Sequence, residues 1–122
     1  MEYLKAGAAS HLYPFVGHTT FDGAGRVLRF LTVVPKVRYW QRYDEDRKYY
    51  DESTAPQDAH EHALYDVLTA DNVLCTLDAT WQLLDYLVAS KDIPVRVAVR
   101  LTRMAHKGNP RYSWTCIVEP RK

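Results

Sequence analysis

The run from Arg26 to Tyr43 is the longest strand-like stretch in the sequence, and it restricts the fold more than any motif does. Pro35 interrupts it, and because proline cannot donate a hydrogen bond to a β ladder, we expect two strands, 26–34 and 36–43. The second strand alternates strictly, so that one face is cationic with an aromatic ring at its centre: Lys36, Arg38, Trp40 and Arg42. The residues that point the other way are Val37, Tyr39, Gln41 and Tyr43.

The end of the chain predicts a β-hairpin with its turn at 105–110. In both strands aliphatic and aromatic residues alternate with polar ones. The expected core face holds Val95, Val97, Val99, Leu101, Tyr112, Trp114, Cys116 and Val118. The other face carries Arg96, Arg100 and Arg111 and is expected to meet solvent or a ligand.

Two helices are expected between these strands. Pro56 suits a first helical turn, and the first helix should end near Ala70. Its apolar stripe is Ala59, Ala63, Leu64, Val67 and Leu68. A short buried strand, 73–77, follows. Asp78 is a suitable N-cap for a second helix that ends near Ser90. The second helix is more apolar and is expected to pack on two sides, through Trp81, Leu83, Leu84, Leu87 and Val88.

This order of elements predicts an α+β fold of two layers, a mainly antiparallel sheet with two helices packed on one face. The 122 residues have the size of one ordinary domain, so we expect a single compact domain over 1–122. The first 25 residues are expected to form an irregular or edge-strand arm. No apolar run approaches the roughly 20 residues of a membrane span, and the N-terminus lacks the basic start and apolar core of a signal peptide.

We therefore expect a cytoplasmic protein with no membrane contact. Cys75 and Cys116 both lie inside apolar runs. In a reducing compartment they are expected to be small core residues and not a disulfide.

The charges are sorted by segment. Residues 44–92 contain twelve acidic and three basic residues, a net charge of −9, whereas the rest of the chain carries +10. In the expected fold the acids would lie on the helical side and the bases on the open sheet face. A segregated basic surface can attract a polyanion even when the whole protein is nearly neutral.

The basic face predicts a nucleic-acid-binding protein. Cations that follow the phosphates and rings that stack on bases are how proteins hold single strands, and the expected fold offers no basic helix for a major groove. The candidate residues are Lys36, Arg38, Trp40, Arg42, Arg47, Lys48, Tyr49, Arg96, Arg100 and Arg111. Single-stranded DNA or RNA is the expected ligand.

The alternative is a small protein-binding or inhibitory accessory protein of the phage or mobile-element type. Its acidic helical side would dock onto a nucleic-acid-handling protein, through Asp44, Glu45, Asp46, Asp58, Glu61 and Asp66. A surface of each sign would also suit head-to-tail self-association, so a homo-oligomer is a further expectation.

No motif predicts catalysis, a metal or a cofactor. His60-Glu61-His62 lacks the second histidine that a zinc-protease helix needs four residues after the first, since that position is Leu64. No Ser or Cys stands in a recognisable nucleophile motif. We therefore expect a binding protein and not an enzyme.

Overall fold

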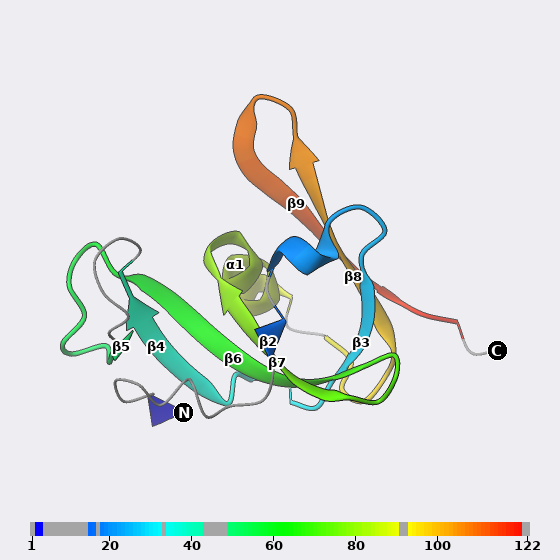
Figure 1. The fold of residues 1–122 in the computed structure, drawn as a ribbon, viewed down its shortest axis with the longest axis horizontal. Coiled ribbons are helices and arrows are strands. Elements are labelled where there is room, and N and C mark those ends of the chain that lie inside the picture. Colours follow the sequence, from blue (N-terminus) through cyan, green and yellow to red (C-terminus); the bar gives the residue numbers. More distant parts are fainter. Residues whose placement is uncertain are drawn as a thin grey trace.

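The computed structural model describes residues 2–3, 15–16, 18–32, 34–42, 49–90 and 93–120. Within these ranges the protein is a strongly twisted, mostly antiparallel sheet with a single α-helix (Figure 1). The strands are β1 (Glu2–Tyr3), β2 (Phe15–Val16), β3 (Arg26–Phe30), β4 (Val37–Gln41), β5 (Tyr49–Tyr50), β6 (His60–Thr69), β7 (Leu74–Thr80), β8 (Val99–His106) and β9 (Asn109–Val118). The helix α1 is Trp81–Ala89, and a 3-10 turn covers His18–Phe21.

The long strand β6 is the centre of the sheet. One of its edges pairs with β4 through 60–64 and with β3 through 67–69, and its other edge pairs with β7 through 62–68, all antiparallel. From β3 the sheet continues through β8 to β9, which form the tall hairpin of Figure 1. The short strands β1, β5 and β2 extend it at β4 and β7.

The predicted first helix is wrong, because its residues form β6. Ala63, Tyr65 and Val67 lie in the main core, whereas Leu64 points to the opposite face and packs with Val37 and Tyr39. A strand buried on both faces is apolar at most positions, so apolar residues also recur at helical spacing by coincidence. The predicted two-layer α+β fold with two helices on one face is therefore corrected to a sheet with one short helix in the described residues.

Other elements lie where the sequence places them. Two strands flank Pro35, the C-terminal hairpin is present, and α1 occupies most of the predicted second helix. That helix begins two residues later than expected because Asp78 continues β7. Thr80 is its N-cap, but the Thr80 hydroxyl makes no capping bond and donates instead to the carbonyl oxygen of Glu61, at 3.0 Å.

The main core lies between α1 and the sheet. It includes Phe21, Phe30, Leu77 and Leu101, all fully buried, and the ring of Phe30 meets Tyr65 edge to face at 5.9 Å. α1 contributes Leu83, Leu84 and Leu87, whereas Trp81 and Val88 are exposed, so the expected packing of this helix on two sides is wrong. Cys75 is buried and Cys116 half-buried; both are free, and burial raises the pKa of the Cys116 thiol. No helix among the described residues is both long and apolar enough to span a membrane.

Candidate functional site

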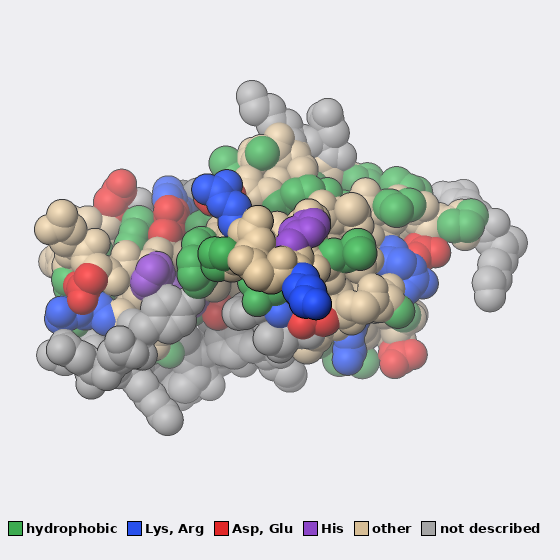
Figure 2. Space-filling view, turned by 90° about the horizontal axis from the view of Figure 1, so that it is seen from above, with side chains coloured by type: hydrophobic (Ala, Val, Ile, Leu, Met, Phe, Trp, Pro, Cys, Tyr) green, Lys and Arg blue, Asp and Glu red, His purple; other side chains and the backbone are tan. Residues whose placement is uncertain are grey.

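The cations on β4 and at its two ends lie beside acids on β6 and just before it. Because the acidic residues 61 and 66 belong to a neighbouring strand and not to a helix, oppositely charged side chains meet across the sheet. Three ion pairs join the two predicted binding sets: Lys36 with Asp66 at 3.6 Å, Arg38 with Glu61, and Arg42 with Asp58 at 3.1 Å. The expected separation into a positive sheet face and a negative helical side is therefore absent from the described residues. Figure 2 shows the same mixing, with Lys and Arg side chains next to Asp and Glu side chains.

The other predicted site residues are dispersed. Arg100 bonds Glu119 at 2.6 Å and the carbonyl oxygen of Ala24 at 3.1 Å. Trp40 is half-buried under the guanidinium of Arg38, 5.3 Å from the ring centre. Tyr49 packs on a smaller core cluster, which is formed by Val37, Tyr39 and Leu64. Arg96 is exposed on a left-handed backbone, and Arg111 is exposed near the hairpin tip. Asp44, Glu45, Asp46, Arg47 and Lys48 lie outside the described residues. The binding roles of all these residues stay predictions.

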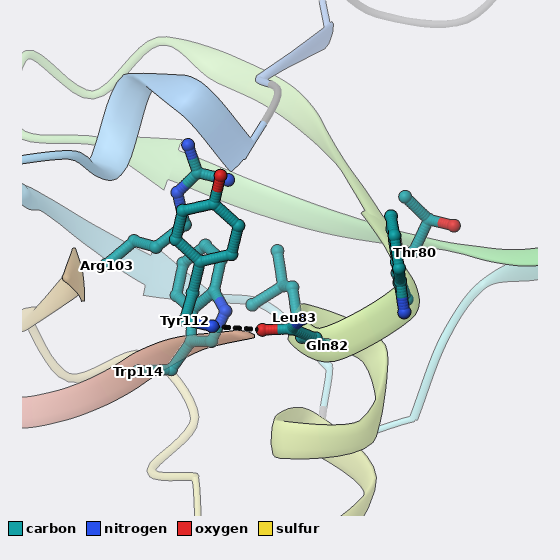
Figure 3. A pocket seen from close by; sticks show the side chains of 7 residues that line it. Thr80, Gln82, Leu83, Arg103, Tyr112 and Trp114 are labelled. Carbon is teal, nitrogen blue, oxygen red and sulfur yellow. Dashed lines mark hydrogen bonds between the residues drawn. The ribbon is translucent and has the colours of Figure 1, made fainter. Parts of the chain in front are cut away.

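A cleft that the sequence did not predict lies between the start of α1 and the β8–β9 hairpin (Figure 3). Its volume is about 210 Å³, and it is lined by Thr80, Trp81, Gln82, Leu83, Arg103, Tyr112 and Trp114. A second hollow of about 380 Å³ shares four of these residues and adds Asp85, Tyr86 and Arg111. Together they form one aromatic cleft with basic residues in its wall.

Gln82 fixes the two sides of the aromatic cleft to each other. Its amide nitrogen donates to the carbonyl oxygen of Pro110 at 3.1 Å, and its amide oxygen accepts the backbone N–H of Tyr112 (Figure 3). The side-chain amide thus mimics a strand residue and ties the first turn of α1 to β9. The link thus joins the two elements that carry Trp81 and Tyr112.

Trp81 is the most unusual residue of the cleft. It is 59% exposed, and its φ of 53° lies in the left-handed region, which bulky side chains rarely adopt. This backbone conformation lies at the junction of β7 and α1, where the large ring is outside the core. Residues held in such conformations concentrate at functional sites. The exposed Trp81 ring is therefore the strongest sign of a binding site in the described residues.

The opposite wall contains a buried cation. The Arg103 guanidinium makes two hydrogen bonds to Asp22, at 2.5 and 2.8 Å, and lies 4.0 Å from the ring centre of Tyr112. These hydrogen bonds raise the pKa of Arg103. The contact with Arg103 supports one face of the Tyr112 ring, which is itself 38% exposed.

Trp114 closes the floor of the cleft. It is only 9% exposed, its ring meets Phe21 edge to face at 5.8 Å, and its buried Nε1–H has no acceptor among the described residues. A buried donor without a partner costs about 1–3 kcal/mol. An acceptor atom of a molecule in the cleft would remove that cost.

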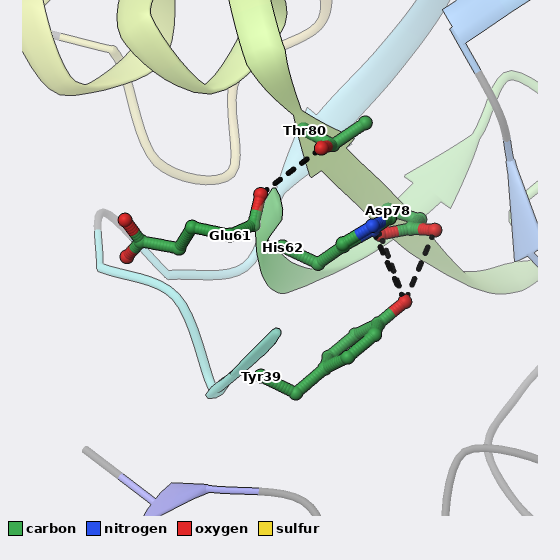
Figure 4. Close-up of polar contacts among 5 residues, drawn as sticks. All are labelled: Tyr39, Glu61, His62, Asp78 and Thr80. Atoms are coloured by element: carbon green, nitrogen blue, oxygen red, sulfur yellow. Dashed lines mark hydrogen bonds and ion pairs between the residues drawn. The ribbon is translucent and has the colours of Figure 1, made fainter. Parts of the chain in front are cut away.

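A polar cluster lies next to the smaller core cluster and includes one of its members, Tyr39. Tyr39, His62 and Asp78 come from three neighbouring strands, β4, β6 and β7 (Figure 4). The Asp78 carboxylate lies 2.9 Å from Nδ1 of His62 and accepts from the Tyr39 hydroxyl at 3.3 Å. The rings of Tyr39 and His62 stack at 4.6 Å. Burial, followed by the charge of Asp78, raises the pKa of Tyr39 far above its ordinary value. No group of three or more potential metal ligands occurs in the ranges described.

The dependence of folding stability on pH in the alkaline range tests this cluster. Because the folded-state pKa of Tyr39 is raised, its contribution is complete below the unfolded pKa near 10 and is lost as the pH rises above it. The loss should be about 1.4 kcal/mol per pH unit for this tyrosine. We expect urea midpoints to fall less steeply above that pH in Tyr39→Phe than in the unmodified protein. Equal slopes would show that Tyr39 is not held in its neutral form by the fold.

Sequence reasoning missed the aromatic cleft because its walls are far apart in the chain. Tyr112 and Trp114 were expected on the core face, which holds for Trp114 only, and Trp81 was counted among the helix's packing residues. The available signals were a tryptophan at the expected first turn of a helix and an aromatic residue just after a hairpin turn. Comparisons with family models, curated proteins and solved structures gave no match, so the interpretation rests on the chemistry of the cleft.

Proposed function

We propose that this protein binds single-stranded nucleic acid without catalysis, and that the bases stack in the aromatic cleft. The observation that carries the proposal is the exposed Trp81 ring on a left-handed backbone, which shares a cleft with Tyr112 and the exposed cation Arg111. Stacking of one base on an aromatic ring contributes about 1–3 kcal/mol and tolerates any sequence. The amide of Gln82 is already engaged, which favours stacking over the reading of base edges.

The cations available to phosphates are those of the hairpin. Arg111 and Lys107 are exposed near its tip, and no ion pair holds them among the described residues. Arg103, by contrast, is committed to Asp22. Of the cations predicted from the sequence, the proposal therefore keeps Arg111 of the hairpin and leaves out Lys36, Arg38 and Arg42, which are ion-paired.

The strand connectivity gives support by analogy. β3 and β4 together act as a first strand that pairs with both β6 and β8, and β6, β7, α1, β8 and β9 follow in that order. This order resembles that of the OB-fold, a small, partly open Greek-key barrel that often binds oligonucleotides near the loop between its last two strands, although β7 and β9 do not pair in the described residues. Here that loop is the tip of the β8–β9 hairpin. The likeness is one of connectivity and supports the proposal by analogy.

A cytoplasmic location belongs to the same proposal and agrees with two free cysteines.

Fluorescence anisotropy with labelled single-stranded DNA and RNA, at low and moderate salt, tests the proposal. Trp81→Ala is expected to weaken binding by roughly 5- to 150-fold, the value of one stacked base. Arg111→Ala should lower the slope of log affinity against log salt by about 0.7, one phosphate contact on a single strand. Val88→Ala is the matched control, because Val88 is exposed on the same helix but does not line the cleft.

Two outcomes would contradict the proposal. Absence of binding at low salt, where electrostatic attraction is strongest, would exclude nucleic acid as the ligand. Binding that is insensitive to Trp81→Ala but weakened by Arg38→Ala and Arg100→Ala would place the ligand on the sheet face and not in the cleft.

A further inference from the structure

The outer edge of β9 is an open edge of the sheet in the described residues, since β9 is the last strand in the order that runs from β1. The backbone N–H of Glu119 donates to the carbonyl oxygen of Ala98 at 2.8 Å, in register with the rest of the β8–β9 pair. Backbone groups alternate in direction along an antiparallel strand. Those of Tyr112, Trp114, Cys116 and Val118 therefore point away from β8, toward the open edge.

Only one end of this edge is covered. Gln82 satisfies the outward-pointing carbonyl of Pro110 and the outward-pointing N–H of Tyr112. The outward backbone groups of Trp114, Cys116 and Val118 have no hydrogen-bond partner in the ranges the structure describes. An edge of this kind is a template for another strand.

The usual protection of an edge strand is missing from this segment. Proteins block such edges with proline, with charged side chains or with bulges. Residues 112–118 contain no proline and no charged residue, and the irregularity of the hairpin lies at Ala105/His106. Ile117 is 62% exposed and Val118 is 54% exposed beside the open groups. The segment thus combines unpaired backbone with exposed apolar surface.

We propose that β9 pairs antiparallel with β9 of a second copy of this chain, around a two-fold axis at Thr115, so that two sheets become one. In this register the outward backbone N–H and carbonyl groups of Trp114 bond those of Cys116 in the second copy. The same groups of Cys116 bond those of Trp114 in the second copy. The carbonyl oxygen of Tyr112 accepts from Val118 of the second copy. A dimer of this type is isologous, with the same segment used on both sides.

Charge complementarity selects this occupant and this register. The charged residues nearest to the uncharged segment are Arg111 at one end and Glu119, which also bonds Arg100, at the other. Pairing around Thr115 brings the Arg111 side chain of each copy toward the Glu119 carboxylate of the other, beyond the backbone groups that Gln82 already satisfies. A shift by two residues in either direction separates them. Thr115 then meets Thr115, a favourable cross-strand pair. Arg111 also lines the aromatic cleft, where an oligonucleotide would compete for it. The test of dimer formation is therefore made without oligonucleotide.

Sedimentation velocity over a range of protein concentrations tests the proposal. The unmodified chain is expected to form a dimer as the concentration rises. Thr115→Lys should abolish it, because two ammonium groups would lie opposite each other, and the exposed position should preserve the fold. Met104→Lys is the matched control: Met104 is an exposed apolar residue of the same hairpin, but it lies on β8 and not at the open edge.

Disulfide cross-linking tests the register independently. In the Cys116→Ser background, Thr115→Cys should cross-link under mild oxidation, because facing residues of a non-hydrogen-bonded pair have Cα atoms about 4.5 Å apart, within disulfide range. Ile117→Cys should not, since Ile117 faces Ser113 of the second copy. A chain that stays monomeric at every concentration, as it would if the edge served a peptide of another protein, overturns the proposal. A dimer that survives Thr115→Lys also overturns it, and so does a dimer that is lost equally in Met104→Lys. Cross-linking through Ile117→Cys but not through Thr115→Cys would contradict the register.

Discussion

Replacing Gly25 by alanine is expected to destabilise the fold by about 3 kcal/mol, because two costs act at the same position. The φ of Gly25 is 73°, a left-handed conformation that a residue with a Cβ adopts at a cost of about 1–2 kcal/mol. A Cβ there would also lie 2.6 Å from the carbonyl oxygen of Leu101 and even closer to the hydroxyl of Thr102. Since Arg26 pairs directly with Leu101, the backbone of β8 cannot retreat without disturbing the β3–β8 register.

Gly23→Ala separates the two costs. Gly23 also has a left-handed backbone, with φ 79°, but a Cβ there would meet no atom within 4 Å. Its expected loss is therefore only about 1–2 kcal/mol. Urea denaturation followed by tryptophan fluorescence measures both variants. Equal losses would show that the approach of Gly25 to β8 is unimportant, and that backbone conformation alone requires glycine at this turn.

The parts of the fold that could be predicted are those set by local sequence. The turn before Arg26, the break at Pro35 and the C-terminal hairpin depend on glycine, proline and strict alternation, and all three are present. β6 could not be predicted in this way. Its alanine, leucine and glutamate favour a helix locally, but pairing with β3, β4 and β7, which lie elsewhere in the chain, decides its conformation.

The same misplaced element explains the misplaced surface. Sorting of charge along the sequence becomes sorting in space only if the acidic and basic segments form different layers. With Glu61 and Asp66 on a strand beside β4, they form ion pairs with Arg38 on β4 and with Lys36 just before it. The aromatic cleft escaped notice for a related reason, since Trp81 and Tyr112 meet only through the packing of α1 on β9.

The second large effect is expected at Asp22, the partner of the buried Arg103 guanidinium. The Arg103 side chain is only 8% exposed, so Asp22→Ala would leave a buried charge without its anion. Breaking a buried pair in this way commonly costs 3–5 kcal/mol. Because Asp22 itself is 49% exposed and water can partly replace it, we expect about 2–3 kcal/mol here. Asp85→Ala, which removes an exposed carboxylate with no ion pair in the described residues, should change stability little.

Arg103→Met distinguishes a lost attraction from a stranded charge. Methionine keeps much of the length of the side chain and its contact with Tyr112, and it leaves no buried cation behind. The double variant Asp22→Ala/Arg103→Met is therefore expected to be more stable than Asp22→Ala alone, as measured by urea denaturation. If the two losses simply add, Arg103 tolerates the absence of its anion, and the Asp22 pair is not what holds this cation in the wall of the cleft.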